Sequence, residues 1–92
     1  MNISKVNGNE PLLYEDIKII IEAENYEKYI HKMCIDEFIT LNDCLNIAIQ
    51  NGYEKGTILV ICESYLIGNI FRYGNYLNDK SWYQVGTMEG FA

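Results

Sequence analysis

The residues best suited to chemistry are one histidine and three cysteines. His31 precedes Cys34 by three positions, and Cys44 and Cys62 follow at wide spacing. In a strand, His31 and Cys34 would lie on opposite faces, so only a helix here would join them as nucleophile and base. Zinc needs about four Cys or His ligands, and no CxxC pair occurs. The spacing favours buried thiols and no metal, with His31 at the surface or in the core.

Carboxylates and glycines give no catalytic signature either. Adjacent acids, as at Glu15-Asp16 and Asp36-Glu37, are typical of turns or solvated faces, whereas glycosidases need two carboxyl groups ~5–9.5 Å apart in a cleft. No glycine-rich phosphate-binding motif occurs. The sequence therefore predicts no enzymatic activity, no catalytic residues and no cofactor. A small-ligand binder or minor enzyme that uses Tyr, Asn and Cys side chains is the third-ranked alternative.

The charge balance restricts the class of partner. The 92 residues include 13 acidic and 7 basic side chains, a net charge of −6, and the pI is about 4.5. Phosphate binding requires clustered Lys and Arg, so direct contact with nucleic acid is disfavoured. An acidic protein suits a basic partner surface. Residues Met1–Lys5 lack the apolar run of a signal peptide, and no segment approaches the ~20 apolar residues of a membrane span. We expect a cytoplasmic protein in a bacterial cell, without membrane contact.

The C-terminal part of the chain, from Gly56 to Ala92, predicts a three-stranded antiparallel meander. It begins with the most apolar run, Ile58–Cys62, which is typical of a buried strand. Asn69–Tyr76 and Ser81–Thr87 alternate aromatic and polar residues, as half-buried hairpin strands do. We expect Leu77–Lys80 to join these two strands.

An N-terminal hairpin is expected to extend this sheet. Ile17–Glu22 is rich in β-branched residues and places alternate Ile side chains on one face. A turn at Ala23–Asn25 would lead into a return strand at Tyr26–Ile35. A helix over Asn25–Met33 is the alternative for the second strand.

A helix over about residues 40–51 is the clearest single element. Thr40 can act as N-cap with Asp43 as its capping-box partner, and Gly52 can end the helix. Leu41, Cys44, Leu45 and Ala48 fall on one face. The predicted fold class is α+β: an antiparallel sheet of about five strands with this helix packed on it. Residues 1–92 would form one domain, with a loose N-terminal arm over 1–11 and a short strand at Ile3–Val6.

Two groups of residues are candidates for binding a protein. One helix covers only one face of a sheet, so we expect some aromatic rings to stay accessible, and Tyr and Trp are common interface anchors. Filling the core is the alternative use of these rings. The aromatic candidates are Tyr73, Tyr76, Trp82 and Tyr83. The acidic candidates, at either end of the hairpin, are Glu22, Glu24, Glu27, Asp36 and Glu37.

The last quarter of the chain carries a resemblance to known sequences. It consists of the segment Ile70–Tyr76, then Trp82-Tyr83, Gly86-Thr87 and the terminal Gly90–Ala92. This pattern resembles the end of small uncharacterised proteins of Firmicutes phages and mobile elements. Small acidic proteins of that origin are similar in character to anti-CRISPR and other anti-defence inhibitors. The resemblance assigns no binding residue to this chain.

The resemblance and the charge together give the leading functional hypothesis. It is a non-enzymatic inhibitor, of the phage-encoded anti-defence type, that binds a basic host protein such as a CRISPR effector or nuclease. An acidic protein can compete for a DNA channel lined with Lys and Arg, and salt would weaken that binding. The alternative is a self-associating structural or accessory module, homodimeric through an exposed strand edge.

Overall fold

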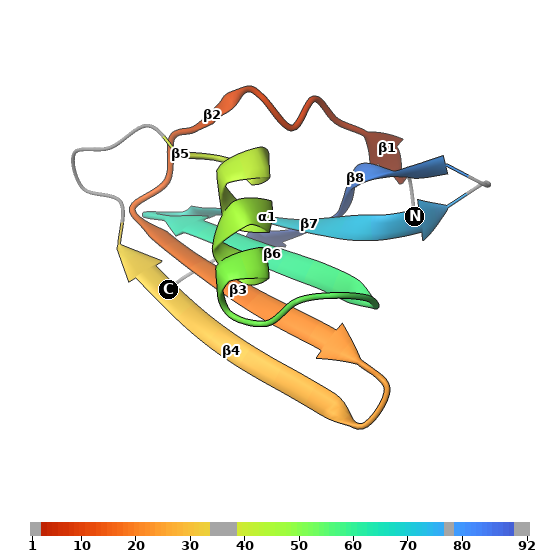
Figure 1. Cartoon of the computed structure of the whole chain (residues 1–92). Helices are drawn as coiled ribbons and strands as arrows, with labels where there is room; N and C mark the ends of the chain where they lie inside the picture. Colours follow the sequence, from red (N-terminus) through yellow and green to blue (C-terminus); the bar gives the residue numbers. More distant parts are fainter. Residues whose placement is uncertain (1–2, 34–38, 77–78, 90–92) are drawn as a thin grey trace.

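The computed structural model describes residues 3–33, 39–76 and 79–89, and it has an α+β architecture (Figure 1). In chain order the elements are β1 (Ser4–Lys5), β2 (Pro11–Leu12), β3 (Asp16–Ala23), β4 (Tyr26–Met33), β5 (Ile39–Thr40), α1 (Leu41–Gln50), β6 (Thr57–Ser64), β7 (Ile67–Tyr76) and β8 (Asp79–Glu89). Six strands form one antiparallel sheet in the order β1-β8-β7-β6-β3-β4, and β2 pairs with β5.

The predicted class is confirmed, and the strand count is higher than predicted. The hairpin β3–β4 and the meander β6–β7–β8 join because β3 pairs antiparallel with β6, with Ile19 opposite Val60. The sixth strand is β1, which pairs with β8 at Ser4 and Lys5. Tyr26–Met33 is a strand, so the helical alternative for this segment is wrong. Asn25, at φ 60°, makes the tight turn before it.

The helix follows the predicted signals closely. Thr40 is the N-cap: its hydroxyl accepts a bond from the Asp43 backbone N–H, and the Asp43 carboxylate accepts one from the Thr40 backbone N–H. The helix ends at Asn51, and Gly52 follows at φ +100°. The helix α1 has ten residues. No helix in the described part of the chain is long and apolar enough to cross a membrane.

The core lies between α1 and one face of the sheet, where α1 contacts β3 and β6 (Figure 1). Alternate residues of each strand point to this face because side chains alternate along a strand. The central fully buried side chains are Ile17, Ile19, Ile21, Ile58, Val60, Cys62, Cys44 and Ala48. Cys44 and Cys62 are the buried thiols that the sequence predicts, and Cys34 lies outside the described residues.

The N-terminal arm, expected to be loose, is hydrogen-bonded to the rest of the molecule. The Val6 N–H donates to the Trp82 carbonyl (3.0 Å), and the Asn42 N–H donates to the Gly8 carbonyl (3.0 Å). The Trp82 indole N–H donates to Asn42 Oδ1 (3.2 Å). A Cβ at Gly8 would lie 2.6 Å from Asn42 Oδ1, so only glycine permits this approach. Asn42 therefore joins the arm, the helix and β8.

Candidate functional site

The face of the sheet opposite α1 carries a patch of aliphatic side chains. Ile20 lies opposite Leu59 on β3 and β6, and Ile61 lies opposite Ile70 on β6 and β7. All four are half-buried, and α1, the helix of the described chain, lies on the other side of the sheet. Tyr29, opposite Ile20 on β4, extends the patch and is 56% exposed. We call this surface the open face; its residues are Ile20, Tyr29, Leu59, Ile61, Ile70 and the exposed Arg72.

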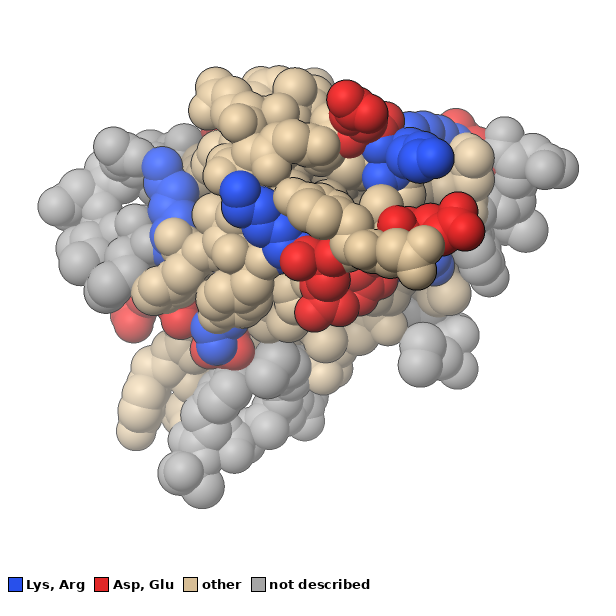
Figure 2. Space-filling view, turned by 60° about the horizontal axis from the view of Figure 1, so that its bottom comes forward, with Lys and Arg blue, Asp and Glu red and all other residues tan. Residues whose placement is uncertain are grey.

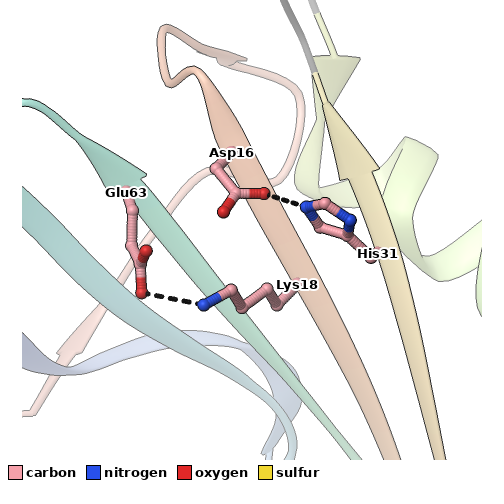
Figure 3. A network of polar contacts seen from close by, with 4 residues as sticks. All are labelled: Asp16, Lys18, His31 and Glu63. Atoms are coloured by element: carbon pink, nitrogen blue, oxygen red, sulfur yellow. Dashed lines mark hydrogen bonds and ion pairs between the residues drawn. The ribbon is translucent and has the colours of Figure 1, made fainter.

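Three charged side chains and His31 border the open face (Figure 3). Across β3 and β4, His31 Nε2 lies 2.5 Å from Asp16 Oδ1, and across β3 and β6, Lys18 Nζ lies 3.4 Å from Glu63 Oε1. The hydrogen bond and negative charge of Glu63 raise the pKa of Lys18 above its ordinary value. These paired charges form a polar margin beside the aliphatic patch. We call them the charged margin.

The charged margin does not assemble a recognisable catalytic or metal site. A histidine–carboxylate pair supports nucleophilic catalysis only with a nucleophile in reach of the imidazole. Among the described residues, no group of three or more His, Cys, Asp or Glu side chains is arranged to hold a metal ion. The margin therefore consists of two separate side-chain pairs, His31 with Asp16 and Lys18 with Glu63.

Three acidic candidates gather at the turn between β3 and β4. Glu22 and Glu27 are directly opposite each other, and Glu24 is exposed in the turn. Directly opposed like charges destabilise a strand pair, and a cation brought by a partner would relieve this repulsion. The hydroxyl of Thr57 donates to Glu22 at 3.4 Å. Asp36 and Glu37 lie outside the described residues.

The acidic side chains do not form one continuous surface on the face shown in Figure 2. There, Asp and Glu lie in separate groups with Lys or Arg close to them. A mimic of DNA would need acids spaced densely along one path, as phosphates are. The turn acids are therefore better suited to attracting a basic partner than to imitating a duplex.

The aromatic candidates are mostly in the core, in contrast to the expectation that they anchor a partner. Trp82 is 2% exposed because α1 and the N-terminal arm cover it. Its ring centroid lies 5.1 Å from that of Tyr73. Tyr83 lies opposite Arg72, on the open-face side of the sheet, and is 7% exposed; its hydroxyl donates to the Asp79 carbonyl. Tyr73 is half-buried beside Lys80, and the side chain of Tyr76 lies outside the described part.

The most exposed aromatic residues that the structure describes are not among the four aromatic candidates. Tyr26, Tyr29 and Tyr65 are 44%, 56% and 80% exposed. Tyr29 could have been found from its alternation with His31 on the polar side of β4, since both point away from the buried Ile residues of β3. The aromatic density of the last third does not by itself show which rings are exposed, since Trp82 is 2% and Tyr65 80% exposed.

A groove lies between the N-terminal arm and the covered face of the sheet. Its volume is about 450 Å³, and its lining includes Leu12, Leu13, Tyr14, Phe71 and Gln84. Behind it, Asn69 Nδ2 donates to the Tyr14 hydroxyl oxygen (2.5 Å) and Asn69 Oδ1 accepts from Gln84 Nε2 (2.7 Å). This chain of bonds leaves the Tyr14 O–H as a donor and Gln84 Oε1 as an acceptor toward the groove.

Comparison of the chain with protein-family models, with curated proteins and with solved structures found no match. The functional argument therefore rests on the geometry of the open face, the charged margin, the turn acids and the groove.

Proposed function

We propose that this protein is a non-enzymatic protein-binding module that contacts its partner through the open face. The observation that carries the proposal is the adjacency of Ile20 with Leu59 and of Ile61 with Ile70 on the side of the sheet away from α1. A solvated sheet face is ordinarily polar at such positions. An apolar centre with a charged border is the usual composition of a protein–protein interface.

The charge of the molecule suggests a basic partner. The net charge is −6, and Glu24 and Glu27 are exposed beside the open face. Opposite charge accelerates encounter and is screened by salt. Within this proposal, the finer assignment is an anti-defence inhibitor that blocks a CRISPR effector or nuclease in the host cell by occupying its basic surface. The acidic charge and the resemblance of the C-terminal segment support that assignment.

A pair of charge-matched variants tests the open face. Leu59→Lys places a cation in the aliphatic patch, and Ile49→Lys makes the same charge change on α1, where Ile49 is already 53% exposed. Binding to purified CRISPR nucleases is measured by calorimetry at low and high salt. We expect wild type and Ile49→Lys to bind one nuclease, with weaker binding at high salt, and Leu59→Lys to lose at least about tenfold in affinity. Equal binding by the two variants would refute the open face as the interface.

The groove favours a second candidate function, the binding of a small uncharged molecule. Its volume lies in the range of about 300–1,000 Å³ typical of ligand sites, and the Tyr14 hydroxyl and Gln84 carbonyl offer one donor and one acceptor beside apolar walls. An apolar amide would match this pattern. A thermal-shift screen of such amides, with Tyr14→Phe as the variant, tests it: hits that stabilise wild type but not the variant support the site, and no hits oppose it.

A further inference from the structure

One edge of the described sheet is the eight-residue strand β4. Residues Tyr26–Met33 of β4 pair with β3 on one side, and no described strand pairs with them on the other (Figure 1). The opposite edge differs, because β1 pairs with part of β8. Backbone N–H and C=O groups along an open edge are a template for another strand. The molecule therefore presents a docking edge at β4.

We propose that β4 pairs antiparallel with β4 of a second copy, with Tyr29 opposite Tyr29 of the partner subunit. The two copies would be related by a two-fold axis perpendicular to the sheet, which makes the interface self-complementary. Two six-stranded sheets would become one continuous sheet. This pairing goes beyond the proposed function and is measured on the isolated protein, so that either idea can fail without the other.

Charge selects the register. In a symmetric antiparallel pair, the residue at the centre faces its own copy, and residues at equal distances from the centre face each other. A register centred on Lys28 would oppose two lysines, and one centred on Ile30 would oppose Lys28 to Lys32 of the partner subunit. Like charges directly opposite each other are destabilising. A register centred on His31 would oppose two histidines.

The register centred on Tyr29 instead places no two side chains of like charge opposite each other. It places Glu27 opposite the partner subunit's His31, twice by symmetry. His31 Nε2 is held by Asp16, and Nδ1, on the side of the ring turned away from Asp16, has no hydrogen bond to a described residue (Figure 3). Within its own chain Glu27 faces Glu22. The partner's His31 would therefore add no second carboxylate to the repulsion that Glu27 already meets within each copy.

The same symmetry has a consequence for the open face. A two-fold axis perpendicular to the sheet keeps both open faces on the same side. Tyr29 lies opposite Ile20 on that face, so the aliphatic patches of the two copies would meet through the paired Tyr29 rings. A partner with two binding sites would then gain avidity from the pairing.

A charge swap tests the register. Glu27→Lys opposes a lysine to the partner's His31, and His31→Glu opposes a glutamate to the partner's Glu27. Within the chain, Glu27→Lys places a cation opposite Glu22, and His31→Glu places an anion opposite Lys18 but loses the contact with Asp16. Sedimentation equilibrium should show dimers for wild type, at least about tenfold weaker association for each single variant, and recovery in the double variant. A monomeric wild type at millimolar concentration, or singles that associate like wild type, would overturn the proposal.

Disulfide trapping gives a second readout that does not depend on charge. In the proposed register the two residues at position 29 have Cα atoms about 4.5–5.5 Å apart, within reach of a disulfide. In a Cys34→Ser background, mild oxidation should convert Tyr29→Cys to a covalent dimer. Tyr65→Cys, at an 80% exposed site away from β4, should stay monomeric. Equal crosslinking of the two variants, or none of Tyr29→Cys, would contradict the register.

Discussion

Ile19 and Ile20 are neighbours on β3 with identical side chains, and they belong to two different environments. Ile19 is fully buried between the sheet and α1, whereas Ile20 is half-buried on the open face. The same alternation separates Val60 from Leu59 and Ile61 on β6. Ile19 and Val60 are buried against α1 and belong to the hydrophobic core. Aliphatic residues also occupy the other set, on the side of the sheet away from α1. Their presence there is the basis for the binding proposal.

The largest expected effect comes from truncating the same residue type on the two faces. Ile19→Ala leaves a cavity in the closed core and should lower the free energy of unfolding by about 2–5 kcal/mol. Ile20→Ala removes atoms that are partly in water and should cost roughly 1 kcal/mol. Urea denaturation followed by circular dichroism measures both. Equal losses would mean that the open face is packed as tightly as the core, and the interface proposal would lose its main support.

How well the sequence predicts the two faces of the sheet depends on how far apart the contacting residues are along the chain. The hairpin, the helix and its cap follow from local signals, such as Thr40 with Asp43 and the alternate Ile residues of β3. The pairing of β3 with β6 brings together segments far apart in the chain, and no local pattern encodes their register. The burial of Trp82 depends on Asn42 and on the arm near Gly8, three separate parts of the sequence. Aromatic density alone therefore could not distinguish the buried Trp82 from an exposed ring.

An intermediate loss of stability is expected where the N-terminal arm is attached to the molecule. There, the arm packs on the covered face of the sheet and not on the open face. Asn42 accepts from the Trp82 indole and donates to Asn9 Oδ1 at 2.6 Å. Asn42→Ala should cost about 1–3 kcal/mol, because the indole N–H loses its partner inside the molecule. Asn46→Ala, one turn along on the exposed side of α1, is the matched control and should change little. Amide hydrogen exchange should show faster exchange at Val6 only in Asn42→Ala.

The smallest effect is expected in the charged margin, where water screens the interaction. The pKa of Lys18 lies above the 10.5 of an unperturbed lysine because of its hydrogen bond and attraction to Glu63. Because the pKa of Lys18 is raised in the folded state, its pairing with Glu63 stabilises the fold fully below pH 10.5. This stabilisation is lost as the pH rises through the folded-state pKa. Glu63→Gln should therefore lower the melting temperature slightly at neutral pH, and by less at a pH above the raised pKa of Lys18. High salt should shrink the difference as well, since both side chains are partly exposed. A loss independent of salt and pH would show that Glu63 acts through packing, and the margin would then belong to the fold rather than to the surface available to a partner.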